Sequence, residues 1–139
     1  MSFVLDNSVS MRWLFGDGKA QDIAHADSVL EHLKHTRALV PVTWGLEVAH
    51  VLARAEAKAL VTEAQSGAFL QILEGLDIAV DAATFTSALS DTLQLARGYR
   101  LSAYDASYLE LALRLKLPLA TLDENLQKAA AKAGVEEFV

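Results

Sequence analysis

Four acidic residues stand where the sequence predicts that helices begin. Each follows a short apolar segment or a capping residue, so each would lie at the end of a strand or in the first turn of the next helix. In a doubly wound α/β fold, such positions can gather at one edge of a parallel sheet. If the four side chains meet, they form a compact cluster of negative charge. The members of this candidate cluster are Asp6, Glu47, Asp105 and Asp123.

A cluster of four carboxylates needs a counter-charge. Two carboxylates about 4 Å apart repel each other by roughly 4 kcal/mol at an effective dielectric constant near 20. No lysine or histidine stands in the four segments that carry the acids. Hard divalent cations with oxygen ligands fill this role, and Mg²⁺ typically takes one or two carboxylates together with waters and phosphate oxygens. The predicted chemistry is hydrolysis of a phosphodiester, in which the ion activates a water and stabilises the departing oxygen.

Each acid also has a purely structural interpretation when it is considered alone. Asp6 and Asp123 each follow a predicted strand and are good N-cap residues for the helix that comes next. Asp105 stands three residues after Ser102, which is the spacing of a capping box. Glu47 lies one turn into its helix, where an acid gains a few tenths of a kcal/mol from the helix dipole. Convergence of the four side chains in space would favour the metal site over the four caps.

Short apolar segments alternate with longer amphipathic segments along the chain. Parallel strands covered by helices on both faces produce this alternation, so it predicts an α/β fold. Gly98 and Gly134 are expected to end the helices that precede them, and Thr43 and Asp81 are expected to cap the helices that follow them. Strands are predicted at 3–5, 38–40, 77–80, 117–122 and 135–139, and helices at 20–35, 43–59, 62–76, 81–97, 102–115 and 123–133.

The bulk composition favours one globular domain over residues 1–139 in the cytoplasm. Of the 139 residues, 53% are hydrophobic and 22% are charged, which is typical of a chain that folds around a core. The absence of cysteine excludes disulfides, zinc ribbons and thiol catalysis, and fits a reducing compartment. No apolar run reaches the roughly 20 residues of a membrane span, and the first residues lack the basic region of a signal peptide.

The net charge of −6 restricts how the chain would bind a nucleic acid. A protein that follows many phosphates needs a basic stripe, and the sequence has none. Acidic clusters recruit cations, however, and those cations can face a phosphate. The charge therefore argues against a long nucleic-acid groove and remains compatible with metal-bridged chemistry at a single phosphodiester.

Other residues with chemical potential receive structural interpretations. His25, His32 and His35 share one predicted helix, but their spacings of seven and ten residues give poor geometry for a zinc site, and they fit a solvated face. The aromatic residues are expected to pack in the core instead of stacking on bases: Trp44, Phe69, Phe85 and Tyr108.

Four segments resemble the motifs of the PIN-domain nucleases, specifically the toxin ribonucleases of VapBC-type toxin–antitoxin pairs. They occur in the family's order and at similar spacing, and the resemblance extends over essentially the whole chain. The third is the most specific, because it sets its acid in a Tyr-Asp-Ala context. The segments are Val4-Leu5-Asp6-Asn7-Ser8-Val9, the stretch from Val40 to Val48, Leu101-Ser102-Ala103-Tyr104-Asp105-Ala106-Ser107-Tyr108 and Ala120-Thr121-Leu122-Asp123-Glu124-Asn125-Leu126.

The resemblance implies a three-layer α/β/α sandwich with a short central parallel sheet, and a homodimer. It also implies cleavage of RNA with Mg²⁺ or Mn²⁺ and a cognate antitoxin protein that blocks the site, often with a basic residue. By this resemblance the four acids carry over as catalytic and metal-binding residues, and Ser8, Thr121 and Asn125 as groups that support them. His50 stands where many relatives have an asparagine, and the motifs assign no role to it, Arg97 or Arg100.

Two other functions compete with this interpretation. The same fold with its acids used as helix caps would be a catalytically silent module that acts through protein or RNA contacts. A phospho-accepting receiver domain also places acids at strand ends, but the chain lacks its combination of an acceptor Asp on a central strand and a late-strand lysine. A stabilising effect of Mg²⁺ or Mn²⁺ distinguishes a metal site from a set of caps.

Overall fold

Four parallel strands form the sheet at the centre of the molecule. In the computed structural model, which describes residues 2–139, the strands pair in the order β3-β2-β1-β4. β1 pairs with β2 through Phe3 and Ala38 and with β4 through Val4 and Leu119. The strands are β1 (Ser2–Leu5), β2 (Arg37–Val40), β3 (Ile78–Val80) and β4 (Leu119–Ala120). The predicted parallel sheet is confirmed.

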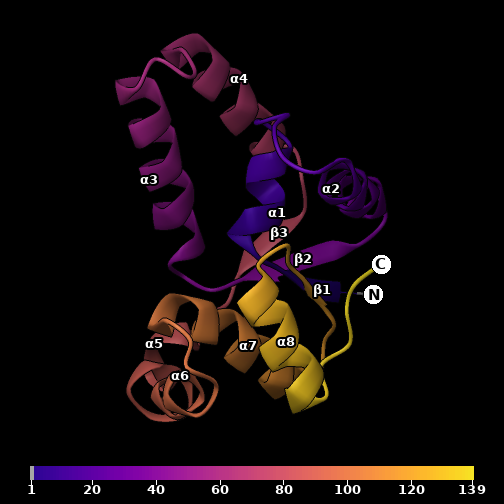
Figure 1. The fold of residues 1–139 in the computed structure, drawn as a ribbon, viewed down its shortest axis with the longest axis vertical. Coiled ribbons are helices and arrows are strands. Elements are labelled where there is room, and N and C mark those ends of the chain that lie inside the picture. The colour runs from indigo at the N-terminus through magenta and orange to yellow at the C-terminus, as the bar shows by residue number, and fades with distance from the viewer. Residues whose placement is uncertain (1) are drawn as a thin grey trace.

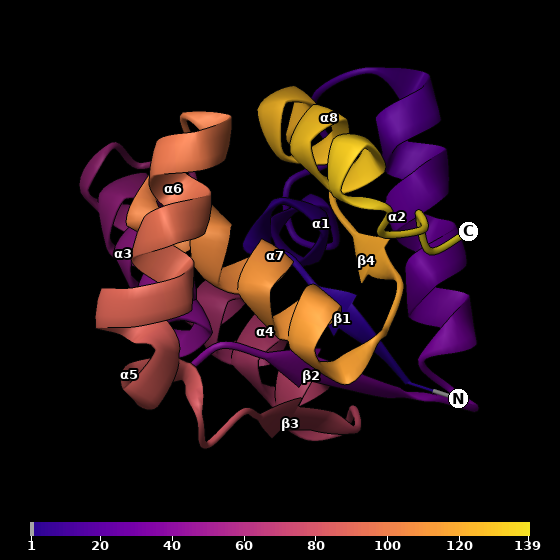
Figure 2. The ribbon, with the colours of Figure 1, turned by 90° about the horizontal axis from the view of Figure 1, so that it is seen from below.

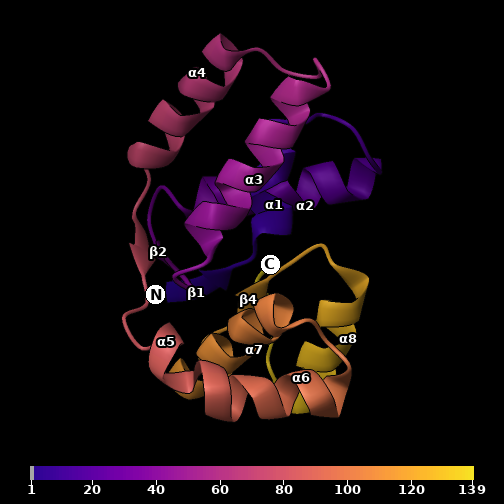
Figure 3. The ribbon, with the colours of Figure 1, turned by 90° about the vertical axis from the view of Figure 1, so that its left-hand side faces the viewer.

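Helices lie on both sides of this sheet, as Figures 1 and 3 show. The first four lie on one side, where α3 and α4 form a pair that extends away from the strands. The later helices lie on the other side, and Figure 2 views the molecule from there. None of the helices in residues 2–139 is long and apolar enough to cross a membrane. They are α1 (Asn7–Arg12), α2 (Ala20–His32), α3 (Trp44–Ala57), α4 (Glu63–Glu74), α5 (Thr84–Ser87), the π-helical η1 (Ala88–Thr92), α6 (Leu93–Tyr99), α7 (Ala103–Leu115) and α8 (Glu124–Ala133).

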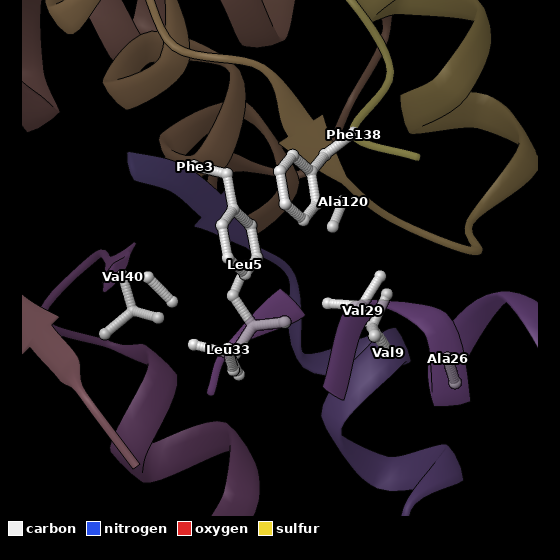
Figure 4. Packing of buried hydrophobic residues seen from close by; sticks show 10 residues of the cluster. Phe3, Leu5, Val9, Ala26, Val29, Leu33, Val40, Ala120 and Phe138 are labelled. Atoms are coloured by element: carbon white, nitrogen blue, oxygen red, sulfur yellow. The ribbon is translucent and has the colours of Figure 1, made fainter. Parts of the chain in front are cut away.

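The alternation of side chains along β1 builds a separate core on each face of the sheet. Phe3 and Leu5 point to one face, where they pack with residues of α1 and α2, whereas Val4 packs on the other face with α7 and α8. Figure 4 shows the first of these clusters, in which the ring of Phe138 stacks on that of Phe3 with their centroids 3.9 Å apart. Because both faces of β1 are buried, this strand is rigidly held between the layers.

A third hydrophobic cluster fixes the pair formed by α3 and α4. It joins these two helices to α1, and its buried members are Met11, Val48, Leu52, Phe69 and Leu73. Val48 and Leu52 are one turn apart on α3, as expected for the buried stripe of an amphipathic helix. This packing positions the first turn of α3, where Glu47 stands.

The strand order reverses between β1 and β4. The chain moves from β1 to β2 to β3 in one direction, then crosses to the opposite edge to form β4. Right-handed crossovers in opposite directions place their helices on opposite faces of the sheet. The carboxyl ends of β1 and β4 therefore flank a topological switch point, which is where ligands bind in open parallel sheets. The chain continues directly from these two ends into Asp6 and Thr121.

Two predicted helix boundaries were wrong. The helix expected to end at Gly98 continues through it to Tyr99, and Arg100 ends it in a left-handed conformation with φ of 57°. Thr43 precedes α3, but its side chain makes no cap hydrogen bond with that helix.

Two predicted strands were too long, and one aromatic residue was misplaced. The strand predicted at 117–122 shrinks to two residues because the chain bends after Ala120, where the Asp123 N–H donates to Thr121 Oγ1. The strand predicted at 135–139 is reduced to one bridge between Leu119 and Glu137. Phe85 was expected in the core, but it is 85% exposed on α5.

Candidate functional site

Asp6 ends β1 and begins α1, but its carboxylate does not cap the helix. It is 3% exposed, and one of its oxygens, Oδ2, accepts hydrogen bonds from Ser8 Oγ at 2.6 Å and Thr121 Oγ1 at 2.7 Å. Burial raises the pKa of Asp6 to about 6, although both hydroxyls lower it, and the charges of Asp105 and Asp123 raise it further. The structural interpretation of Asp6 as a simple cap is therefore wrong.

Ser8 and Thr121 tie the carboxyl ends of β1 and β4 together. The Leu122 N–H donates to Ser8 Oγ at 3.0 Å, and the Asp123 N–H donates to Thr121 Oγ1 at 3.1 Å. The same two hydroxyls hold Asp6, so both residues lie where the sequence resemblance placed supporting groups. Their hydrogen bonds fix the Asp6 carboxylate at the switch point of the sheet.

Asn125, the third residue expected to support the acids, is placed differently. It is exposed on α8, and its side chain forms no hydrogen bond with any of residues 2–139. Gln127 on the same helix donates from Nε2 to the carbonyl oxygen of Thr121 at 2.9 Å. Gln127 thus anchors the turn that carries Thr121, a role that the sequence analysis missed.

Glu47 faces the sheet from the first turn of α3. Its Oε1 accepts a hydrogen bond from the hydroxyl of Tyr108 at 2.8 Å. Burial raises the pKa of Glu47 to about 7; the Tyr108 hydroxyl lowers it, and the negative charges of Asp6 and Asp105 raise it. Glu47 is therefore part of the same electrostatic cluster as Asp6, although it comes from a different helix.

Tyr108 connects the core to the site. It is fully buried among residues of α7 and β1, as the sequence analysis expected of a core aromatic, but its hydroxyl also positions Glu47. Its place three residues after Asp105 puts the two on neighbouring positions of one helical face. That spacing was the signal in the sequence that Tyr108 points in the same direction as the acid.

Asp105 and Asp123 differ in how they use their carboxylates. Ser102 caps α7 by accepting a hydrogen bond from the Asp105 N–H at 3.0 Å, which leaves the Asp105 carboxylate outside the cap. Burial raises the pKa of Asp105, the charge of Asp123 raises it further, and Ser102 lowers it. Asp123 caps α8, because its Oδ1 accepts from the Leu126 N–H at 2.9 Å. The cap uses one of its two oxygens, so Asp123 combines a structural role with membership of the cluster.

The four acids thus lie close enough to influence one another's ionisation. Asp6 interacts with Asp105 and Asp123, and Glu47 interacts with Asp6 and Asp105. No salt bridge within residues 2–139 involves any of the four. In that part of the chain, no three carboxylate, imidazole or thiol side chains are arranged to hold a metal ion as they stand. The four-carboxylate metal site therefore stays a prediction.

The cluster opens into a pocket between α3 and the start of α7. The pocket has a volume of about 550 Å³, and Glu47 and Asp105 both line it. His50, one turn after Glu47, lines it as well and is exposed to solvent. Two of the four acids are thus accessible to a molecule that enters this pocket.

Comparison with solved structures finds the same fold in three proteins of low sequence identity. The crystal structure of PAE2754 from Pyrobaculum aerophilum matches with a TM-score of 0.65 and 23% identity over 93% of this chain and 79% of that one. The crystal structure of VapBC2 from Rickettsia felis, bound to a DNA fragment from their promoter, matches with a TM-score of 0.68 and 12% identity over 99% of this chain and 98% of that one. The crystal structure of FitAcB from Neisseria gonorrhoeae matches with a TM-score of 0.57 and 19% identity over 100% of this chain and 97% of that one.

Sequence comparisons match this chain to a family but to no individual curated protein. No curated protein matches the chain. The sequence model of the PIN domain, however, matches residues 3–132, which include all four acids and the whole sheet except Ser2. The three-layer arrangement of helices around a short parallel sheet agrees with that match. The chain belongs to the PIN domain family.

Proposed function

We propose that the chain is a metal-dependent endoribonuclease, the toxin of a VapBC-type toxin–antitoxin pair that acts in the cytoplasm. The observation that carries this proposal is the group of acids at the switch point, where burial and mutual repulsion raise the pKa of Asp6, Glu47 and Asp105. Buried acids that repel one another and lack a cationic partner are typical of sites that bind a hard cation. PIN domain membership supports nuclease chemistry at such a site.

The donor set fits Mg²⁺ or Mn²⁺. It consists of carboxylate oxygens, which these ions prefer, and it contains neither thiol nor imidazole. Asp6, Asp105 and Asp123 would hold the ion, with Glu47 completing the site or orienting the attacking water. When bound, the ion supplies an activated water and stabilises the departing oxygen of the phosphodiester. Ser8 and Thr121 keep the Asp6 carboxylate in place through their hydrogen bonds.

The proposed partners are an antitoxin protein and a second copy of the chain. One protein of the same fold is named VapBC2, after the type of pair that the sequence motifs resemble. An acidic pocket suits a basic residue from an antitoxin. Phe85 and Leu89, which are one turn apart and 85% and 89% exposed, support an apolar contact such as a dimer interface.

The metal site is tested first by stability. A ligand that binds the folded chain alone stabilises it by RT ln(1 + [L]/Kd), so Mg²⁺ or Mn²⁺ raises the unfolding temperature if the site exists. The Asp105→Asn variant loses this shift, and the matched surface variant Asp91→Asn retains it. Absence of a shift in the unaltered chain would favour the catalytically silent module.

The reaction is tested with the same two variants. Asp105 suits this purpose because α7 is capped through the backbone N–H of Asp105, which the variant retains. We expect Asp105→Asn to reduce RNA cleavage about a hundred- to a thousandfold, as removal of a charge-stabilising group does in other enzymes, while Asp91→Asn leaves it unchanged. Undiminished cleavage by purified Asp105→Asn would disprove the assignment.

A further inference from the structure

Most of the pocket beside the acids has no role in the function proposed above. Glu47 and Asp105 account for its acidic side, and the remaining walls come from α3, the start of α1 and the start of α7. Its volume of about 550 Å³ lies within the range of pockets that enclose small organic groups. No lysine or arginine lines it, although His50 does, so its walls offer no permanent positive charge for a further phosphate.

Two polar groups in the pocket walls lack partners. Asn7 is 6% exposed, and its Oδ1 accepts a hydrogen bond from Ser10 Oγ at 3.2 Å, but its Nδ2 donates to no group of residues 2–139. Thr43 Oγ1 is buried and has no hydrogen-bond partner in the same part of the chain. Buried polar groups in proteins are nearly always paired. Of these two atoms, only Thr43 Oγ1 is both buried and unpaired, whereas Asn7 Nδ2 is a free donor that solvent reaches. Both residues line the pocket, so a ligand with hydrogen-bonding edges would pair with them.

The remaining walls combine the apolar and aromatic surface of Leu46, Val51 and Tyr104 with the polar side chains of Ser102 and His50. Tyr104 is 61% exposed and Leu46 is 73% exposed, and each directly precedes one of the acids in the sequence. A ligand between them would therefore lie next to the site where the phosphodiester is held. Flat apolar faces combined with polar edges are the chemical character of a nucleobase, and exposed aromatic rings are the usual platform on which unpaired bases stack.

We propose that this pocket binds one unpaired nucleobase of the RNA, next to the phosphodiester that is cleaved. The inference rests on the proposed ribonuclease function and adds the subsite that would set its sequence preference. Tyr104 and Leu46 contact the faces of the base, while Asn7 Nδ2 and Thr43 Oγ1 contact its edge. An apolar side chain of a protein partner would leave Thr43 Oγ1 unpaired and would cut Asn7 Nδ2 off from solvent, so the structure favours the base.

Single abasic nucleotides in the RNA test the proposal directly. We expect one abasic position next to the cleaved bond to lower kcat/KM about ten- to a hundredfold, the usual effect of losing one base stack. Tyr104→Ala should lower it by a similar factor on intact RNA and cause no further loss on the abasic RNA. Thr43→Val, which keeps the side-chain shape, should alter which base is preferred there. Ile72→Ala, an equally exposed change on α4, is the control.

Binding measurements separate failure of the subsite from failure of the nuclease. The same RNAs are titrated in Ca²⁺, and fluorescence anisotropy reports binding without cleavage. Base-dependent binding without cleavage in Mg²⁺ or Mn²⁺ supports the pocket and contradicts the nuclease. Cleavage that is equally fast on intact and abasic RNA supports the nuclease and overturns the proposed base pocket. The pocket is also overturned if Tyr104→Ala lowers kcat/KM on abasic RNA by the same factor as on intact RNA. Absence of both RNA binding and cleavage overturns both proposals.

Discussion

Two groups of buried carboxylates lie in this molecule, and one of them has a cation of its own. Asp81, in the loop after β3, and Glu110, on α7, both bind Arg114, with contacts of 2.6 and 2.7 Å. Burial alone would raise the pKa of Asp81, but hydrogen bonds from Arg114 and Thr84 outweigh it, and the pKa is lowered. This group fixes α7 against the end of β3.

The pKa values of the acids at the switch point are shifted in the opposite direction. Asp6 has hydroxyl partners in place of a guanidinium, and its pKa rises to about 6; that of Glu47 rises to about 7. Burial acts in the same direction in both groups, so the difference comes from the partner. A carboxylate that is paired with a cationic side chain contributes to the fold. Carboxylates that repel one another favour the binding of a cation from solution.

Removal of Arg114 should lower the free energy of unfolding more than any other change considered below, because it breaks both ion pairs of the paired group. Arg114→Met keeps the length of the apolar stem and leaves Asp81 and Glu110 buried without their partner. Loss of one member of a fully buried ion pair costs about 3 kcal/mol or more. Because the Arg114 side chain is 31% exposed, we expect about 2 kcal/mol, which urea unfolding at pH 7.5 measures. Adding Asp81→Asn and Glu110→Gln should restore most of the loss. If Arg114→Met alone leaves the free energy of unfolding unchanged, Arg114 does not stabilise Asp81 and Glu110, and the contrast between the two groups of acids fails.

The pH dependence of stability should reveal the unpaired group. The pKa of Asp6 is raised from 3.8 to about 6 and that of Glu47 from 4.5 to about 7, so between these limits the folded chain binds more protons than the unfolded chain. The free energy of unfolding of the metal-free protein therefore falls as pH rises from about 4 to about 7. We expect a fall on the order of 2 kcal/mol, less than the two shifts would give in full, because water screens the half-exposed Glu47. Urea titrations in EDTA across this range measure the fall.

Metal and the paired acid provide the controls for that experiment. Saturating Mn²⁺ holds the acids ionised and should reduce the fall. Asp81 contributes stability that is present above its unfolded pKa and lost as pH drops through its lowered folded value, so its effect appears at lower pH. Stability that stays flat from pH 4 to 7 without metal would contradict the electrostatic account of the cluster.

Removal of one acid should have opposite effects in the two groups. Glu47→Gln keeps an oxygen that accepts from the Tyr108 hydroxyl and removes a charge that repels Asp6 and Asp105. We expect it to stabilise the metal-free chain by about 1 kcal/mol at pH 7.5 and to weaken the metal-induced shift. Glu110→Gln is the matched change beside Arg114 and should destabilise. Destabilisation by both would place Glu47 among the structural acids.

The sequence was most informative where local chemistry determines the structure. β1 and β2 were located within one residue because buried parallel strands read as short apolar runs, and Ser102 and Asp123 cap their helices as their types predict. The alternation of elements, with an acid after β1 and another after β4, was enough to predict which edge of the sheet carries the site. These inferences require neighbours that lie close in the chain.

Features that depend on distant contacts were not predicted. The bond between Tyr108 and Glu47 joins residues 61 positions apart, and nothing in either local segment specifies it. Phe85 carries an apolar ring into solvent, which hydrophobicity alone predicts to be buried. The partners of polar groups are likewise set by tertiary packing: Asp81 was expected only to cap the next helix, and its ion pair with Arg114, 33 positions away, was not predicted.

Removal of the Tyr108 hydroxyl should have the smallest effect on stability, and it tests most specifically what sets the pKa of Glu47. Its hydrogen bond lowers the pKa of Glu47, so Tyr108→Phe should raise that pKa further above its ordinary range. The acidic limb of the cleavage pH profile, or of Mn²⁺ binding, then moves to higher pH, while stability falls by about 1 kcal/mol or less. Tyr99→Phe, whose hydroxyl forms no side-chain hydrogen bond in residues 2–139, is the control. An unmoved pH profile would show that Tyr108 serves the core alone, because loss of packing changes stability without shifting the ionisation of Glu47.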